Sequence, residues 1–113
     1  YVLSGHADSI IRVWSVATLA EVGQLKGHTR DITQVAVHPN GTTVASTSHD
    51  RTLRLWHLPT RTEFGILDEG AGTGWDCCFS PDGSRLARIL RGFSVNAAHE
   101  FRVWDVTHGM KGE

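Results

Sequence analysis

One phrase, with serine, aspartate, arginine and tryptophan at fixed offsets, occurs twice in this chain and constrains its fold more than any other feature. SGHADSIIRVW runs from Ser4 to Trp14, and STSHDRTLRLW runs from Ser46 to Trp56. A third ending, FRVWDV, contains Trp104. The three tryptophans lie 42 and then 48 residues apart. Self-similarity at a period of this length is typical of arrays of small structural units, so the chain is interpreted as a set of repeats.

The residues between these tryptophans predict short strands rather than helices. Runs of β-branched and aromatic residues are broken at regular intervals by Gly, Pro, Asn and Asp, and no stretch keeps a helical period. The Asn-Gly pair at 40–41 favours a tight hairpin turn because both residues tolerate positive φ. For the middle unit we expect four strands in an antiparallel meander, at 31–37, 43–47, 52–57 and 62–67.

The flanking segments repeat the same pattern less completely. The turn SPDG at 80–83 matches HPNG at 38–41. Strands are expected at 1–5, 10–15 and 20–25 before the middle unit, and at 73–79, 85–90 and 101–106 after it. The chain is therefore expected to hold one four-stranded unit between two three-stranded ones.

Composition narrows the function classes. The formal net charge of −1 over 113 residues argues against binding to nucleic acid or to an anionic membrane. No apolar run approaches the ~18 residues that a membrane-spanning helix needs. Cys77 and Cys78 are adjacent, so on a strand they point to opposite faces and do not form a disulfide with each other. Two free thiols favour a cytoplasmic or nuclear protein, and the seven histidines lack metal-ligand spacing, so neither a metal nor a cofactor is expected.

These features together resemble the WD40 repeat family over essentially the whole chain. The motifs that carry the resemblance are Gly27-His28, the turn at 38–41, Ser46 with Asp50 four residues later, and Trp56 six residues beyond that aspartate. The resemblance implies an all-β fold of WD40 β-propeller blades, each a four-stranded antiparallel sheet, with repeats at approximately 1–16, 17–58 and 59–106 of a single unit, 1–113. A closed propeller has typically 4–8 blades and this chain supplies under three, so we expect an incomplete propeller. It is then either a fragment of a longer protein or a unit that closes by assembling copies.

The resemblance assigns His28, Ser46, Asp50 and Trp56 to the family's buried hydrogen-bond chain. A catalytic interpretation of the serine, histidine and aspartate is the alternative. It is disfavoured because a nucleophile needs exposure and an adjacent oxyanion site, whereas strand positions beside a tryptophan lie inside a blade.

The flanking units depart from this pattern. The first retains Ser4, Asp8 and Trp14, and its histidine is expected to precede the first residue of the chain. The third retains Trp104 only, with Arg88 at the position of Ser46, and an insertion at 91–99 accounts for its longer spacing. That insertion is interpreted either as a recognition loop or as drift in a degenerate blade.

The resemblance also implies a set of partner-facing residues at one rim of the propeller. They lie three and five residues after the Gly-His histidine and just before the turn aspartate: Asp31, Thr33 and His49, with Thr73 and Trp75 in the third unit. Two of them have structural alternatives, because Trp75 can be a packed strand residue and His49 a solvated turn residue.

The chain is therefore predicted to be a non-catalytic scaffold that binds a protein or peptide on the propeller rim. A regulatory or sensor propeller segment of a larger signalling or enzymatic protein is the alternative. Binding to chromatin or RNA is opposed by the near-neutral charge. Self-association through exposed blade edges is a further expectation.

The hydrogen-bond chain generates a stability prediction. Asp50→Ala is expected to lower the free energy of unfolding by about 1–3 kcal/mol, because it leaves buried polar groups without a partner. Thermal melts of the variant and the parent measure the loss. Identical melting curves would show that Asp50 has no such role.

Overall fold

The computed structural model describes residues 2–69, 75–90 and 101–106, and within these ranges all regular structure is β. The strand ends agree with the sequence-based ranges to within two residues, which confirms the all-β prediction. The strands are β1 (Val2–Gly5), β2 (Ile10–Trp14), β3 (Glu21–Lys26), β4 (Ile32–Val37), β5 (Thr43–Ser48), β6 (Thr52–His57), β7 (Thr62–Glu69), β8 (Trp75–Phe79), β9 (Arg85–Leu90) and β10 (Phe101–Asp105).

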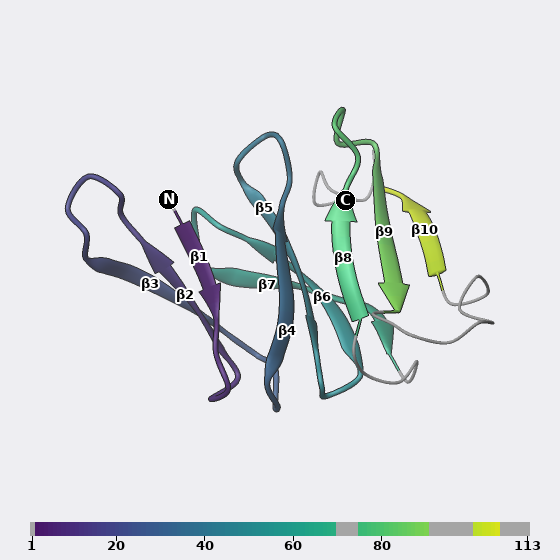
Figure 1. The fold of residues 1–113 in the computed structure, drawn as a ribbon. Helices are drawn as coiled ribbons and strands as arrows, with labels where there is room; N and C mark the ends of the chain where they lie inside the picture. Colours follow the sequence, from purple (N-terminus) through teal and green to yellow (C-terminus); the bar gives the residue numbers. More distant parts are fainter. Residues whose placement is uncertain (1, 70–74, 91–100, 107–113) are drawn as a thin grey trace.

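The strands form three antiparallel meanders that follow one another along the chain. The first sheet is β1-β2-β3, the middle sheet is β4-β5-β6-β7, and the third sheet contains β8, β9 and β10 in that order. Figure 1 shows the three sheets side by side, with the middle sheet between the other two. This is the arrangement of consecutive blades in a partial β-propeller.

The strand register shows that the sheets are true structural repeats. Trp14 lies opposite Val2, Trp56 opposite Val44, and Trp104 opposite Leu86, so each tryptophan occupies the same place in its sheet. The residues with positive φ also recur every 42 positions, in the pairs Ser9 and Arg51, Leu19 and Arg61, and Gly41 and Gly83. The insertion at 91–99 lies outside the described residues.

The middle sheet is covered on both faces, and every residue of β5 is buried. Trp56 and Val44 face the first sheet, where Ile11 and Val13 complete one apolar core. Ala45 and Leu53 of the middle sheet face the third sheet in a second core. Because alternate residues of a strand point to opposite faces, β5 and β6 contribute to both cores at once. The described residues therefore form three layers of sheet, with one apolar core between the first and middle sheets and a second between the middle and third sheets.

A histidine in the β4–β5 turn ties the middle sheet to the third. The Nε2 atom of His38 lies 2.8 Å from the carbonyl oxygen of Gly83, and its ring meets Phe79 edge-on at 5.0 Å. Gly83 has a φ of +77°, and a Cβ at this position would lie 2.4 Å from the imidazole. Glycine is thus required at this position both for its backbone conformation and for the close contact.

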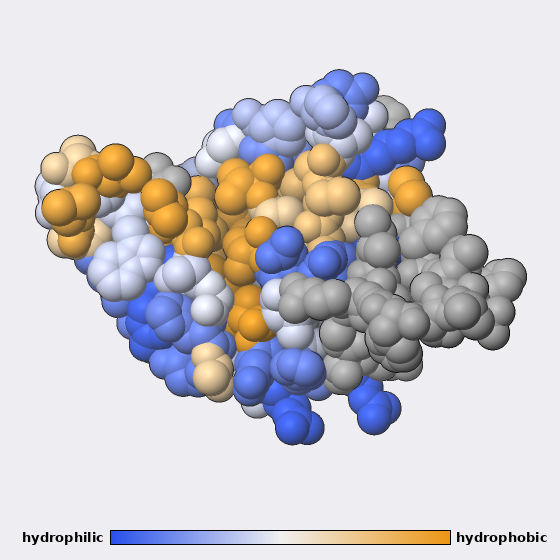
Figure 2. All heavy atoms as spheres, viewed as in Figure 1, coloured by the Kyte–Doolittle hydropathy of each residue, from blue (hydrophilic) through white to orange (hydrophobic). Residues whose placement is uncertain are grey.

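The outward-facing surfaces of the first and third sheets keep apolar side chains in solvent. Val2 is 53% exposed and Val22 43% on the first sheet, and Val103 is 46% exposed on the third. Figure 2 shows apolar residues gathered on the hairpin between β2 and β3 as well. Among the described residues there is no helix with the length and apolar character to span a membrane.

The positive-φ turns generate a prediction at Leu19, which is 82% exposed and has a φ of +61°. The left-handed region destabilises a residue with a Cβ by roughly 1–2 kcal/mol. Glycine avoids this strain, but its greater freedom in the unfolded chain offsets part of the gain in stability. We expect Leu19→Gly to raise the free energy of unfolding by about 0.5–1 kcal/mol in urea titrations. Ala20→Gly, at an exposed neighbour without positive φ, is the matched control and is expected to be destabilising. Equal effects of the two changes would contradict the argument.

Candidate functional site: a repeated hydrogen-bond chain and the rim beside it

A chain of hydrogen bonds runs across the middle sheet from Trp56 to Asp50. The indole Nε1 of Trp56 on β6 donates to Ser46 Oγ on β5 over 2.8 Å. Ser46 Oγ lies 2.6 Å from His28 Nε2, and His28 Nδ1 lies 2.8 Å from Asp50 Oδ2. His28 comes from the segment before β4, and Asp50 from the turn between β5 and β6. The chain thus connects β5, β6, their turn and the approach to β4.

The direction of these bonds follows from what each group can donate. An indole N–H only donates, so Ser46 Oγ accepts from Trp56 and has its own proton left for His28 Nε2. His28 Nδ1 then carries the ring's proton and donates to the Asp50 carboxylate. The opposite tautomer would place a bare ring nitrogen against a carboxylate oxygen. The geometry therefore assigns a neutral His28 protonated at Nδ1.

Burial and hydrogen bonding shift the pKa values of both ionisable members. Burial lowers the pKa of His28, against the opposing effect of Asp50, and this keeps the ring neutral. Burial alone would raise the pKa of Asp50, but hydrogen bonds from the Thr52 hydroxyl, the Thr29 amide and His28 lower it to about 2. The carboxylate is therefore ionised and the imidazole neutral at pH 7.

Thr52 and Glu63, which the sequence analysis did not single out, support the chain together with Arg54, the arginine of the repeated phrase. Arg54 Nε donates to Thr52 Oγ1 over 3.0 Å, and its guanidinium forms an ion pair with Glu63 on β7 at 3.1 Å. Gly27 leaves room for this arrangement, since a Cβ there would lie 2.6 Å from Glu63 Oε1 and 2.8 Å from the Trp56 ring. A recurring Arg two residues before each tryptophan, at 12, 54 and 102, is the sequence signal that could have revealed the ion pair.

The first sheet contains a shorter version of the same chain. Trp14 Nε1 donates to Ser4 Oγ over 2.9 Å, and Ser4 Oγ lies 2.7 Å from Nε2 of His6. His6 follows Ser4 by two residues, so a histidine from the β1–β2 turn stands where the middle sheet has one from outside the hairpin. Asp8 forms an ion pair with Arg12 at 2.8 Å, and its hydrogen bond from Arg12 is the largest cause of its lowered pKa.

In the third sheet the register places Arg88 where the middle sheet has Ser46. Arg88 lies opposite Cys77, as Ser46 lies opposite Val35. Arg88 is buried, and Trp104 packs against the core between the middle and third sheets. A guanidinium at this position needs different partners from a serine hydroxyl, so this sheet retains the tryptophan position without the serine.

The serine, histidine and aspartate of the middle sheet are poorly placed for nucleophilic catalysis. Ser46 is fully buried and its hydroxyl already joins Trp56 to His28, so no substrate reaches it. Within residues 2–69, 75–90 and 101–106, no three His, Cys, Asp or Glu side chains are grouped so that they could hold a metal ion.

Two of the expected partner-facing residues are brought together at one rim. The backbone N–H of His49 donates to the carbonyl of Asp31 over 2.9 Å, and both residues are exposed. Thr33 lies at a break in the β4–β5 register between Ile32 and Gln34, and its hydroxyl lies 2.8 Å from that of Thr47. A bulge of this kind redirects a side chain relative to the regular strand.

The remaining expected positions are only partly described. Trp75 is the first residue of β8 and lies opposite Leu90. Thr73 and the 91–99 insertion lie outside the described residues. Of the expected rim residues, the structure therefore describes the side chains of Asp31, Thr33 and His49, all in the middle sheet.

Comparison with known proteins identifies the family of this fold. The model of the WD domain, G-beta repeat, matches residues 19–57. The chain is 28% identical over 103 residues to WD repeat-containing protein VIP3 of Arabidopsis thaliana, covering 91% of this chain and 30% of the relative. It is 40% identical over 75 residues to mouse pre-mRNA-processing factor 19, covering 65% of this chain and 15% of the relative. The chain therefore carries WD40 repeats.

A further relative is p21-activated protein kinase-interacting protein 1-like of Danio rerio, with 32% identity over 93 residues, or 80% of this chain and 24% of that protein. The chain thus spans less than a third of the length of each of these three relatives.

The pKa shifts predict how stability depends on pH. The folded pKa of Asp50, about 2, is below its ordinary value of 3.8, so its stabilisation is present above pH 4 and is lost as the pH falls from about 4 to 2. The pKa of His28 is also lower in the folded chain than its ordinary value of 6.5. The unfolded chain therefore takes up a proton first, and stability begins to fall as the pH drops below about 6.5. Urea titrations from about pH 6.5 down to about pH 2 measure both losses of stability.

Matched variants separate the two groups. The difference in stability between the parent and Asp50→Asn is expected to narrow as the pH falls from 4 to 2. The difference in stability between the parent and His28→Gln is expected to narrow below about pH 6.5. His57→Gln, which changes an imidazole at the far end of β6, controls for general effects of histidine removal. A difference that stays constant with pH would show that the group titrates normally in the folded protein.

Proposed function

We propose that this chain is part of a non-catalytic WD40 scaffold that binds a protein or peptide at the rim formed by Asp31, Thr33 and His49. The observation that carries the proposal is that neighbouring residues differ in whether they face inward or are exposed. His28, Ser46 and Asp50 are turned inward and joined to one another, whereas Asp31 and His49 lie beside them, exposed and held by a backbone hydrogen bond.

The rim suits binding because its backbone is held in place. The carboxylate of Asp50 accepts hydrogen bonds from the amides of Thr29 and Thr52, which flank the exposed residues in the sequence. Ser48 Oγ donates to the carbonyl of Arg30 over 3.0 Å and accepts from the amide of Asp50. A backbone held in this way loses little conformational freedom on binding.

Relatives support a role in protein interaction. One of them is named p21-activated protein kinase-interacting protein 1-like, which describes a protein that interacts with a kinase. The alternative role, a regulatory segment of a larger protein, is supported by the small share of each relative that the chain covers. Both roles use the same rim.

We also propose a reducing location, cytosol or nucleus. Cys77 and Cys78 are free, and burial raises the pKa of Cys77 to about 12, so this thiol stays protonated. The name of the relative pre-mRNA-processing factor 19 is consistent with the nuclear option.

The rim is tested by selecting peptides from a displayed library on the immobilised chain and measuring their affinity for variants. Asp31→Ala combined with His49→Ala is expected to weaken binding at least tenfold while the melting temperature stays within about 2 °C, because both side chains are exposed. Thr60→Ala, in the β6–β7 turn at the opposite rim, is the control. Selected peptides that lose affinity with Thr60→Ala and not with the double variant would place the binding surface elsewhere.

A further inference from the structure

Two exposed arginines, Arg30 and Arg51, lie on the rim beside Asp31 and His49. Arg30 belongs to the segment that leads into β4, and Arg51 to the turn between β5 and β6. Among the described residues, neither guanidinium has a hydrogen-bond or ion-pair partner. Both positive charges are therefore available to a ligand that approaches the rim.

Ser48 holds the backbones of the two arginines close to each other. Its hydroxyl donates to the carbonyl of Arg30 over 3.0 Å, and its own carbonyl accepts a hydrogen bond from the amide of Arg51 over 3.1 Å. Ser48 is buried. Because both arginines are bonded to one buried residue, their long side chains start from neighbouring points of the rim. Two unpaired cations in this arrangement repel each other, and an anion placed between them removes the repulsion.

The turn that contains Arg51 does not itself need an arginine. Arg51 has a φ of +73°, a left-handed conformation that strains a residue with a Cβ. Ser9, at the same position of the first sheet, has a φ of +71°, so the turn imposes this conformation on different residue types. Strained residues of this kind are concentrated at binding and catalytic sites. The guanidinium of Arg51 therefore has a reason to be there outside the turn itself.

The charges of the rim follow the order of the strands. Asp31 lies at the start of β4, Ser48 with its bonded Arg30 at the end of β5, and Arg51 just before β6. Since β5 lies between β4 and β6 in the sheet, the negative group is at one end of this row and the positive groups follow it. A ligand with charge complementarity to the row carries a cation at the β4 end and an anion toward β6.

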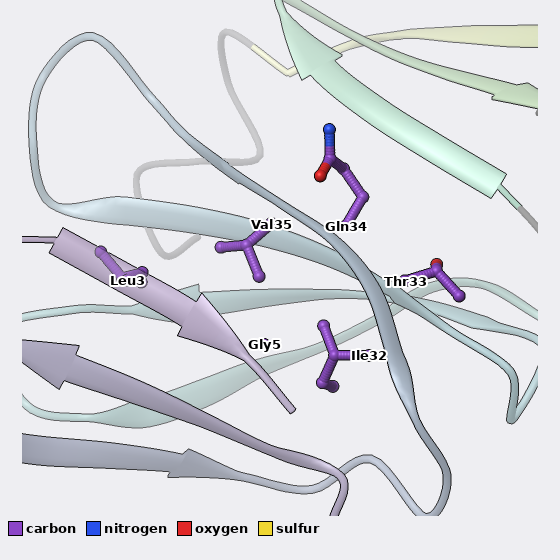
Figure 3. Close-up of a pocket in the computed structure, with 6 residues that line it drawn as sticks. All are labelled: Leu3, Gly5, Ile32, Thr33, Gln34 and Val35. Atoms are coloured by element: carbon purple, nitrogen blue, oxygen red, sulfur yellow. The ribbon is translucent and has the colours of Figure 1, made fainter. Parts of the chain in front are cut away.

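The hollow between β1 and β4 is less suitable for a charged ligand. It has a volume of about 240 Å³ and is lined by six residues, none of them charged: Leu3, Gly5, Ile32, Thr33, Gln34 and Val35. Figure 3 shows Ile32 and Val35 pointing from β4 toward β1, whereas Thr33 points the other way. A charged side chain in the hollow would lose water without gaining an opposite charge. The arginines of the rim offer that opposite charge.

We propose that the rim selects an extended peptide segment of a partner protein in which an aspartate or glutamate side chain lies between Arg30 and Arg51 and a basic side chain meets Asp31. This inference rests on the function proposed above and adds the charge pattern of the partner. A guanidinium binds a carboxylate through two parallel hydrogen bonds, and this geometry distinguishes arginine from lysine. The acidic side chain thus determines which segments bind and in which direction they cross the rim.

Charge reversal tests the proposal. A random-sequence peptide library displayed on phage is selected on the 113-residue chain and, separately, on the double variant Arg30→Glu with Arg51→Glu. The parent is expected to enrich peptides with aspartate or glutamate, and the charge-reversed variant to enrich lysine or arginine at the same peptide position. Selection of the same acidic peptides by both chains overturns the proposal.

The strongest acidic peptide from the parent selection is then synthesised with a label and titrated by fluorescence anisotropy. Changing its acidic residue to the amide, Glu to Gln or Asp to Asn, is expected to weaken binding to the unchanged chain about tenfold. Arg30→Gln with Arg51→Gln is expected to weaken binding of the acidic peptide to the same extent and that of the amide peptide hardly at all. Arg85→Gln, at an exposed arginine that begins β9, is the matched control and leaves both affinities unchanged.

The outcomes separate this inference from the function on which it rests. Equal binding of the acidic and amide peptides overturns the charge preference, and so does equally strong competition by a single-stranded oligonucleotide. If such peptides still lose affinity with Asp31→Ala and His49→Ala, the rim remains the binding surface and only the charge preference is wrong. Peptides whose affinity no rim variant changes contradict both proposals.

Discussion

The hydrogen-bond chain from Trp56 to Asp50 is the interaction on which the middle sheet depends. It joins β6 to β5, β5 to the segment before β4, and that segment to the β5–β6 turn. Every member is buried or nearly so, and each uses its hydrogen-bonding capacity on the next. A shift of one residue in any strand would break several of these bonds at once, so the chain fixes the register of the sheet.

The second constraint is that a sheet with two apolar faces needs a cover on both. The middle sheet satisfies it with the first sheet on one side and the third on the other, and Trp56 is fully buried as a result. The equivalent Trp14 has no sheet over it among the described residues and is only half-buried. The same sequence phrase thus has a different environment in each repeat.

The proposed rim surface follows from these constraints. At the rim, the polar residues that hold the turn are turned inward, and their neighbours Asp31 and His49 are left exposed on a fixed backbone. Affinity at the rim would come from side chains.

Much of this architecture could be predicted from the sequence, because its signals are local. Turn residues and alternating β-branched runs located the strands, and the period of the tryptophans located the repeats. The residues grouped by the family resemblance, His28, Ser46, Asp50 and Trp56, are those that the structure links in a chain. Positive φ at Ser9, Leu19, Arg51 and Arg61 was not foreseen, because none of these residues favours that conformation and the strand pairing imposes it.

What the sequence by itself determined was the repeating unit: four strands, their order, and the polar residues that hold them. Only the tertiary structure decided which faces are covered and which polar groups meet. The ion pair of Arg54 with Glu63, the need for glycine at position 27 and the use of His6 by Ser4 all depend on side chains brought together in space. A repeat pattern specifies local pairing, whereas burial and the choice of hydrogen-bond partners depend on what packs against each sheet.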